Sequence, residues 1–336
     1  MAGFSKNIVD MLFISVVIPA YNKKNSLQSA IGSLYNQSYP KDKYEVIVVD
    51  DGSTDGTQQW VKLKQQDCSC RLRYFYQANK GPAAARNLGI RNASGDIIAF
   101  IDSDCIASYS WIEKLVNGYN NDRVAGIGGT IKARPTTSKI SRYCAYIKMN
   151  EQPPIDDTGI VYLITGNASF RKSSLGLVGG FDERYNSAGG EDPDLCYRLK
   201  ERGYILKYNR DAVVYNHHKE KFGEFLRTYF NYGKGDSFLV IRRFSNWDLV
   251  SVSGIRWFFN FIKLAGIMAL KCLNIFSLSL KLLKIPFKML LYYGEGLNMQ
   301  EGFIYASLDY FKVFSFVGGH FFGYIIGKFK GFKKTE

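Results

Sequence analysis

Two aspartates that follow a short apolar run are the residues of this chain whose types and spacing most directly suggest chemistry. Asp102 and Asp104 come after IIAFI at residues 97–101, a β-branched and aromatic run short enough for a buried strand. Alternate side chains of an extended strand share a face, so we expect Asp102 and Asp104 to point the same way and Ser103 the other way. Such carboxylates suit Mg²⁺ or Mn²⁺, which commonly bind substrate phosphates as well, although a solvated turn would also account for them.

A second acidic cluster lies in GGEDPDLCYRL at residues 189–199. The two glycines free the backbone and Pro193 fits the first turn of a helix, so we expect a helix to begin here. Asp192 would then be the N-cap, which is the structural explanation for this residue. Asp194, two residues after Asp192, would stabilise the helix N-terminus through its charge.

Alternating strands and helices are expected to position these groups. The expected strands cover residues 14–22, 44–50, 71–76, 97–101, 127–131, 162–170 and 204–215. In the first of these ranges we expect Pro19 to stop the strand. The expected helices cover residues 26–34, 57–66 and 82–93. This alternation predicts an α/β fold with a mostly parallel sheet and right-handed crossovers, and ligands collect at the carboxyl ends of such strands.

Three loops therefore fall at one edge of the expected sheet, at residues 19–22, 50–52 and 102–104. They offer groups that a nucleotide needs: an aromatic ring at Tyr21, an acceptor for base N–H groups at Asp51 and a carboxylate for ribose hydroxyls at Asp102. The carboxylates that follow the second strand could instead form a plain turn that caps the next helix.

Four motifs in this order resemble the family 2 glycosyltransferases of GT-A fold. They are VIPAYN at residues 17–22, VVDDGSTDGT at 48–57, NKGPAAARNLG at 79–89 and IDSD at 101–104. The resemblance covers about two-thirds of the chain and stops near Leu239. It implies a Rossmann-like catalytic domain that binds a nucleotide-diphospho-sugar in its first half.

The resemblance also implies roles for individual residues. The donor would contact Pro19, Ala20, Tyr21, Asn22, Asp51, Lys80, Arg86, Asn87, Asp102 and Ser103. Mn²⁺ or Mg²⁺ would be held by Asp104 with Asp102. Asp192, directly after a glutamate, would be the catalytic base, and the acceptor would contact Glu191, Asp194, Gly166 and Asn167. For Arg86 a charge on a helix surface, and for Asp194 helix stabilisation, are the structural alternatives.

A histidine pair closes the expected catalytic domain. Related enzymes often carry His-x-His at this point, where one His helps to hold the metal or the diphosphate. This chain has Asn216 in the first His position, followed by His217 and His218. Either histidine could be a metal ligand or could have a structural role.

Composition indicates a partner with negative charge. The net charge of +14 is concentrated from Asn216 onward, where 17 Lys and Arg stand against 8 Asp and Glu. This part is also apolar, which favours an anionic membrane surface over nucleic acid. The six cysteines show no repeating spacing and no signal peptide precedes the domain, so we expect free thiols and a cytoplasmic chain.

The last third combines apolar and cationic residues. Between residues 256 and 288 the polar and basic side chains fall within an arc of about 140° at ~100° per residue, which predicts an amphipathic helix in the membrane interface. A soluble helix packed on the catalytic domain is the alternative. The uncharged run 313–327, with Gly319, Gly323 and Gly327 on one face, could be an embedded hairpin, a re-entrant helix or a packing element.

These patterns predict three regions: an N-terminal extension over 1–12, a GT-A domain over 13–238 and a helical, membrane-associating region over 239–336. The expected activity is inverting, metal-dependent transfer of a sugar from a nucleotide-diphosphate donor, UDP being favoured. The acceptor would be a saccharide or lipid-linked hydroxyl at the cytoplasmic membrane face, reached by peripheral or monotopic attachment. The alternatives are a polyprenyl-phosphate sugar synthase and a non-catalytic nucleotide-sugar-binding membrane subunit.

Overall fold

The computed structural model describes residues 12–66, 70–156, 159–244 and 297–329, which divide into two compact units. Unit 1 comprises Met1–Thr136 and Cys144–His218, and unit 2 comprises Thr137–Tyr143 and Lys219–Glu336, each within those described ranges. The boundary expected at residues 238/239 falls inside helix α8 (Phe222–Phe244). The units divide before this helix because α8 packs along α11 (Met299–Phe329) of the same unit.

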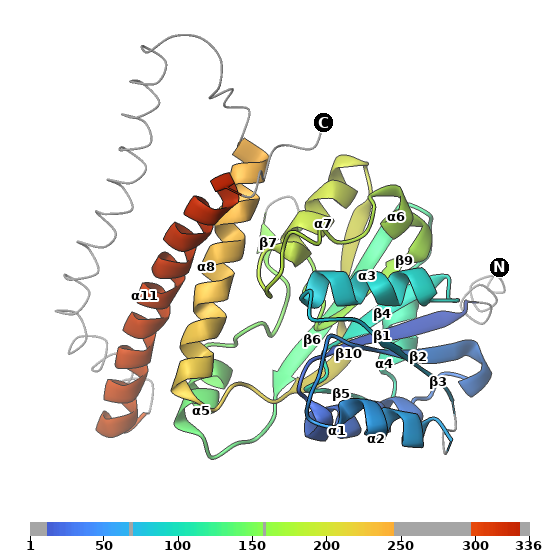
Figure 1. The fold of residues 1–336 in the computed structure, drawn as a ribbon, viewed down its shortest axis with the longest axis horizontal. Helices are drawn as coiled ribbons and strands as arrows, with labels where there is room; N and C mark the ends of the chain where they lie inside the picture. The colour runs from blue at the N-terminus through green and yellow to red at the C-terminus, as the bar shows by residue number, and fades with distance from the viewer. Residues whose placement is uncertain (1–11, 67–69, 157–158, 245–296, 330–336) are drawn as a thin grey trace, which may run out of the picture. The chain divides into compact units, whose positions relative to one another are not determined.

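Unit 1 is built on an eight-stranded sheet in the order β3-β2-β1-β4-β9-β6-β10-β5 (Figure 1). Its strands are β1 (Ile14–Ala20), β2 (Tyr44–Asp50), β3 (Arg71–Tyr76), β4 (Ile97–Ile101), β5 (Cys105–Ala107), β6 (Val124–Ala133), β9 (Asn167–Arg171) and β10 (Ile205–Asn216). A separate hairpin joins β7 (Ile155–Asp156) to β8 (Gly159–Ile160). The helices of this unit are α1 (Lys24–Tyr35), η2 (Lys41–Lys43), α2 (Thr57–Lys64), α3 (Pro82–Asn92), α4 (Trp111–Val116), α6 (Lys172–Leu177) and α7 (Glu191–Glu201), while α5 (Lys139–Tyr146) crosses the boundary between the units.

The sheet is mixed, with four parallel and three antiparallel strand pairings among the described residues. The pairings of β1 with β2 and β4, of β2 with β3 and of β6 with β10 are parallel, as the strand–helix alternation predicts. The expectation fails at β9, which runs antiparallel to β4 and β6, and at β5, which runs antiparallel to β10. Short apolar strands carry no direction in their residue pattern, so the neighbours with which they pair in the sheet decide it.

The strands of the first half of the sheet are a major part of the apolar core, which extends to β6 and β10. Every residue of β2 and β4 is buried, and the apolar residues of β1 are buried as well. The expectation that Pro19 ends β1 is wrong. The strand continues to Ala20 in register with β2, and Pro19 pairs with Val49. Four cysteines of the described residues, Cys70, Cys105, Cys144 and Cys196, are buried free thiols, as expected.

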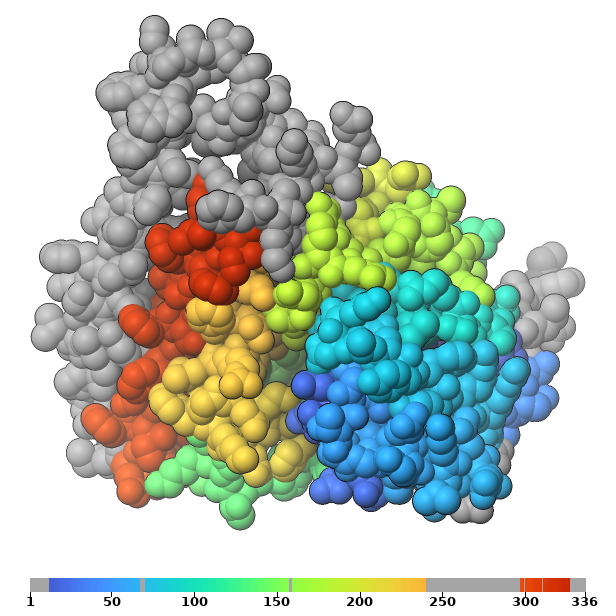
Figure 2. All heavy atoms as spheres, viewed as in Figure 1, coloured from blue at the N-terminus to red at the C-terminus, as the bar shows by residue number. Residues whose placement is uncertain are grey.

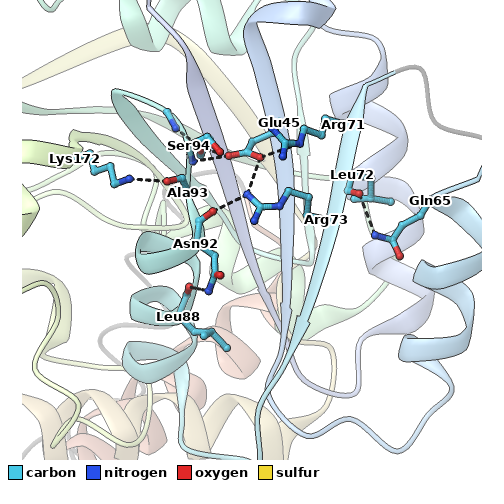
Figure 3. A network of polar contacts seen from close by, with 12 residues as sticks. Glu45, Gln65, Arg71, Leu72, Arg73, Leu88, Asn92, Ala93, Ser94 and Lys172 are labelled. Carbon is cyan, nitrogen blue, oxygen red and sulfur yellow. Dashed lines mark hydrogen bonds and ion pairs between the residues drawn. The ribbon is translucent and has the colours of Figure 1, made fainter.

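A buried glutamate joins the starts of these strands (Figure 3). Glu45 of β2 accepts hydrogen bonds from the Ser15 hydroxyl (2.7 Å) and the Ser94 backbone N–H (2.7 Å). It also pairs with Arg73 of β3 at 3.0 Å. Burial works against the charge of Glu45, but the bonds from Ser94, Ser15 and Arg73 prevail and lower the pKa of its carboxyl below 4.5. This polar cluster lies at the amino ends of β1 and β2, away from the carboxyl ends where ligands collect.

Unit 2 is a close pair of long helices together with the first part of α5. A Cβ added to Gly319 of α11 would overlap the carbonyl oxygen of Phe230 in α8, and one added to Gly233 of α8 would overlap that of Phe316. A Cβ added to Gly323 would overlap the hydroxyl oxygen of Ser237 in α8. Gly319 and Gly323 of run 313–327 therefore allow α11 to pack closely on α8.

The membrane prediction is only partly addressed by these helices. None of the helices among the described residues combines the length and apolar character needed to cross a bilayer. The segment 256–288, for which an amphipathic interface helix is expected, lies outside the described residues.

Candidate functional site

Two loops meet at the carboxyl ends of β1 and β2, as the sequence predicts. Asn22, whose φ is +51°, donates its backbone N–H to the Ser53 hydroxyl (2.9 Å) and accepts a bond from the Thr54 N–H (2.8 Å). The Asp51 N–H donates to the carbonyl of Ala20 at 2.8 Å. Tyr21, expected at the base of a nucleotide, is half exposed next to these contacts.

Asp51 is already bonded to the loop before α3. Its carboxylate accepts bonds from the Lys80 N–H (2.8 Å), the Gly81 N–H (2.9 Å) and the Gln77 side chain (2.7 Å), and the residue is only 5% exposed. Asp51 thus fixes the backbone of this loop and leaves the Lys80 side chain exposed. Its expected contact with a base stays a prediction.

The two aspartates of the IDSD motif lie in a turn and not in an extended strand. β4 ends at Ile101, and the Cys105 N–H donates to the carbonyl of Asp102 at 3.0 Å. The expectation that strand alternation sets the directions of these side chains is therefore wrong. Ser103 is nevertheless buried while Asp102 and Asp104 are both partly exposed.

Asp192 is held by a threonine from another segment. The Thr165 N–H donates to Oδ2 of Asp192 at 2.9 Å, and the Thr165 hydroxyl donates to Oδ1 at 2.7 Å. Gly190 is the N-cap of α7, so the expectation that Asp192 is the cap is wrong. The left-handed φ of +88° suits glycine at that position and moves Asp192 into the first turn.

The environment of Asp192 makes it a carboxyl that titrates near neutrality. Burial, and next the charge of Glu191, raise the pKa of Asp192 to about 6, against the opposing effects of Arg86 and of the bonds from Thr165. A general base functions best when its pKa lies near the operating pH, because it is then both ionised and able to accept a proton. Asp192 meets this condition.

Arg86 of α3 links the two acidic clusters. Its guanidinium lies 3.0 Å from Glu191, 3.5 Å from Asp102 and 4.0 Å from Asp192, and its side chain is only 6% exposed. Burial disfavours its charge, but the fields of Asp192, Glu191 and Asp102 prevail, and the pKa of Arg86 is raised above its ordinary value. Arg86 is therefore buried and paired, and the alternative of a charge on a helix surface is wrong.

Two asparagines expected at the site, Asn87 and Asn167, make hydrogen bonds that stabilise the fold of unit 1. Asn87 clamps Phe181 through bonds to its backbone N–H and carbonyl, both 2.8 Å long. Asn167 is 1% exposed and bonds to Trp111, Thr130 and Ala212. In Figure 2, cyan atoms from the part of the chain that includes α3 adjoin yellow-green atoms from later in unit 1, and the ion pair of Arg86 with Glu191 joins α3 to α7.

The remaining expected acceptor residues differ in their surroundings. Glu191 is 3% exposed and accepts bonds from Arg86 and from the Gly189 N–H. Asp194 pairs with Arg198 one turn along α7, which supports its helix-stabilising role. Gly166 lies beside Asp102, because a Cβ at this position would meet Oδ2 of Asp102 at 3.0 Å.

The donor atoms near Asp104 fit a hard divalent cation. The His217 N–H donates to the carbonyl of Asp104 at 3.3 Å, so the histidine pair adjoins the motif, with His217 exposed and His218 buried. Asn216 pairs with Cys105 and its Oδ1 is buried with no hydrogen-bond partner among the described residues. Within the described ranges no three His, Cys, Asp or Glu side chains form a cluster that could hold a metal ion by itself.

The structure adds residues that are absent from the expected site. Thr165 has no motif of its own, and its only signal is its position directly before Gly166 and Asn167. A cavity of about 370 Å³ in unit 1 is lined by Asn79, Lys80, Ala84, Glu183 and Asn186, of which Lys80 alone is expected. Glu183 and Asn186 reach this cavity from a loop far along the chain.

Comparison with known proteins agrees with this geometry. Residues 15–178 match the family model described as glycosyl transferase family 2, and residues 97–299 match glycosyl transferase family group 2. Glycosyltransferase AglE of Haloferax volcanii is 32% identical over 225 residues, which cover 66% of this chain and 72% of that protein. A pre-mycofactocin glycosyltransferase of Mycobacterium tuberculosis is 30% identical over 68% of this chain, and the match spans about half (48%) of its own length.

Two solved structures share the fold. A mannosyltransferase of Pyrobaculum calidifontis, in complex with GDP-Man and Mn²⁺, superposes with a TM-score of 0.51 at 21% identity, covering 73% of this chain and 67% of its own. Residues 1–349 of TarS from S. aureus, in complex with UDP-GlcNAc, give a TM-score of 0.51 at 19% identity, covering 68% of this chain and 66% of their own.

Proposed function

Because the chain belongs to the family 2 glycosyltransferases, and shares its fold with structures that hold nucleotide-sugar donors, we propose that it transfers a sugar with inversion to a hydroxyl acceptor. The proposed acceptor is a saccharide or a lipid-linked glycan. The proposed donor is a nucleotide-diphospho-sugar with UDP favoured, while the solved neighbours hold UDP-GlcNAc and GDP-Man.

The observation that carries this proposal is the environment of Asp192. Inversion requires one in-line displacement, in which the acceptor oxygen forms a bond to the anomeric carbon while the bond to the nucleoside diphosphate breaks. Asp192 takes the acceptor proton, and the electron pair of the broken bond leaves with the diphosphate. The bonds from Thr165 keep the carboxylate oriented, and its pKa of about 6 leaves it mostly ionised at pH 7.

The donor side is proposed to lie at Asp102, Asp104 and the loop before α3. A divalent cation bound by Asp104, with Asp102 and a histidine or Asn216 nearby, would stabilise the negative charge of the departing diphosphate. The buried, unpartnered Oδ1 of Asn216 and the partly exposed Asp104 support this donor set. Mn²⁺ in the Pyrobaculum calidifontis mannosyltransferase supports the choice of ion.

The alternatives receive less support from the same residues. A phosphate acceptor, as in a polyprenyl-phosphate sugar synthase, is already anionic and has no need of a carboxylate held and poised near neutrality. A non-catalytic subunit would not need that arrangement either. The basic, apolar last third supports action at a membrane surface, and the cytoplasmic face is part of the proposal.

The experiment that tests the base is Asp192→Asn. We expect turnover to fall by ~10²-fold or more, the usual scale for a lost general base, with donor affinity nearly unchanged. Release of nucleoside diphosphate from UDP-GlcNAc, UDP-glucose and GDP-mannose, assayed with Mn²⁺ or Mg²⁺, gives turnover, and calorimetry gives donor affinity. Asp211→Asn, an exposed aspartate of β10, is the matched control. Retention of most of kcat in Asp192→Asn would refute the base role.

A further inference from the structure

We propose that Thr165 is a positioning residue for the reaction, which holds both carboxylate oxygens of Asp192 and keeps this carboxyl in its ionised, proton-accepting form. The inference rests on the proposed function, because it concerns the residue assigned there as the base. It assigns a task to a residue outside the four motifs and outside the acidic cluster of α7.

Thr165 makes two hydrogen bonds to the carboxylate of Asp192, and a single hydrogen bond would not fix the orientation of that carboxylate. The Thr165 backbone N–H donates to Oδ2 of Asp192 at 2.9 Å while its hydroxyl donates to Oδ1 at 2.7 Å. Two donors of one residue thus contact two oxygens of one carboxylate and restrict its rotation. Thr165 is itself only 1% exposed, so solvent does not compete for these bonds.

The backbone around Thr165 is fixed as well. The Asn167 N–H donates to the carbonyl of Ile164 at 3.0 Å, which closes a turn around Thr165 and Gly166. β9 begins at Asn167, whose amide is anchored in the core. Gly166 lies against Asp102, so this turn sits between the proposed base and the proposed donor site. A threonine carried on such a turn can hold Asp192 at a defined distance from the donor.

The charged groups around Asp192 act together with the Thr165 hydroxyl on the ionisation of the Asp192 carboxyl. Glu191 on the same helix and burial both favour the protonated carboxyl, while Arg86 from α3 favours the ionised form. Arg86 lies closer to Glu191 (3.0 Å) than to Asp192 (4.0 Å) and also faces Asp102. Cys196, one turn along α7, is a buried thiol. Arg86 has the larger effect in favour of the ionised form of Asp192, and Thr165 adds to it the two direct hydrogen bonds to the carboxylate oxygens.

Thr165→Val tests this role because it removes the hydroxyl and keeps both the shape and the backbone N–H. Hydrogen bonds to a charged carboxylate lower its pKa, so we expect the acidic limb of the pH profile of kcat/KM to move up by about one pH unit. Loss of orientation should also reduce the plateau of kcat by about 10-fold. Thr165→Ser restores the donor and should return both values toward those of the parent.

The readouts are a pH profile and a direct titration. Donor hydrolysis with Mn²⁺ gives the profile, using whichever of UDP-GlcNAc, UDP-glucose and GDP-mannose the parent turns over. Carbon-13 NMR of labelled aspartates follows Asp192 without any acceptor, its signal being assigned by its absence in Asp192→Asn. Thr130→Val is the matched control, since Thr130 is a buried threonine whose hydroxyl contacts Tyr208 and Arg210.

The outcomes separate this inference from the proposed function. An Asp192 midpoint that is the same in Thr165→Val and in the parent overturns the inference, even if Asp192→Asn abolishes turnover. Full turnover in Asp192→Asn overturns the proposed function, whatever Thr165→Val shows. A shift in Thr165→Val that also appears in Thr130→Val would indicate a general loss of packing and would count against the positioning role. Circular dichroism of each variant confirms that it is folded.

Discussion

At the scale of single residues, Arg86 brings together groups that the sequence assigns to separate tasks. Asp102 was expected on the donor side and Glu191 and Asp192 on the acceptor side, and the guanidinium contacts all three within 4.0 Å. Such a buried cation lowers the cost of placing three carboxylates in one region. The diphosphate contact expected for Arg86 stays a prediction, and the observed role is to hold the acidic clusters together.

Asp104 is the residue on which the proposed metal site depends. Asp104→Ala removes the carboxylate that is not paired with Arg86, so we expect donor binding to lose its dependence on the metal. Calorimetry with UDP in the presence and absence of Mn²⁺ measures this. Asp122→Ala, an exposed aspartate outside the site, is the control. Equal gains in UDP affinity from Mn²⁺ in the parent and in Asp104→Ala would remove the metal assignment.

At the scale of elements, the start of the sheet depends on a buried carboxylate. Glu45 joins β1, β2, β3 and the segment before β4 through its bonds to Ser15, Arg73 and Ser94. Its pKa is lowered in the folded state, so the stability it contributes is present above the unfolded pKa near 4.5 and is lost as pH falls below it.

Glu45→Gln should therefore lower stability at pH 7 and matter less in acid. We expect a loss of about 2 kcal/mol at pH 7, the scale of a disrupted buried polar network, and a smaller difference from the parent below pH 4. Urea unfolding of the parent and of Glu45→Gln at pH 7 and at pH 3.5 measures this difference. Glu113→Gln, on an exposed position of α4, should change little. A difference that stays constant between pH 7 and pH 3.5 would contradict the ionic role of Glu45.

The glycines of α11 offer a second prediction at this scale. Gly319→Ala places a methyl group against the Phe230 carbonyl and should separate α8 from α11, whereas Gly318→Ala meets only the Phe230 ring at 4.0 Å. Alanine favours a helix over glycine by about 1 kcal/mol, so Gly318→Ala should be neutral or stabilising. Thermal unfolding and limited proteolysis of unit 2 compare the two. A stabilised Gly319→Ala would show that the helices do not need this close approach.

At the scale of the whole molecule, charge and apolar character are concentrated after Asn216. Each lysine near an anionic surface contributes ~1 kcal/mol to membrane binding, and apolar area contributes the remainder. Membrane association stays a proposal, and it concerns the segment 256–288 outside the described residues.

Charge reversal in that segment tests the proposal. Changing Lys263, Lys271, Lys281 and Lys284 to Glu should release the protein from anionic liposomes and leave hydrolysis of the soluble donor intact. Salt should weaken binding of the parent, because charges are screened over ~8 Å at physiological ionic strength. The control reverses the same number of exposed charges in unit 1, at Lys62, Arg123, Arg202 and Arg210.

Two results of the liposome experiment would contradict the interface helix. Release by detergent alone, with no response to salt or charge reversal, would indicate a segment that inserts into the bilayer. A parent protein that stays in solution without lipid and does not bind liposomes would indicate that the apolar side chains pack internally.

The local pattern of residues determined the family and the bounds of several strands, but the strand expected over 162–170 is wrong in its first part, because β9 covers only Asn167–Arg171 and a turn precedes it. β2 and β4 have the bounds expected from their buried apolar runs, and β3, a mixed run with two arginines, also has its expected bounds. The four motifs sufficed to predict a family 2 glycosyltransferase, since they depend on residue types at short spacing. The meeting of the loops after β1 and β2 followed from the parallel pairing of those strands.

Only the tertiary structure decided which of these residues contact one another. Thr165 and Asp192 are 27 positions apart, and Arg86 and Glu191 are 105 positions apart. Hydrophobic periodicity carries no information on such pairs, because they form when separate helices and strands pack on one sheet. For the same reason the direction of β9, the burial of Asn167 and the close approach of Gly319 to Phe230 became apparent only in the folded chain.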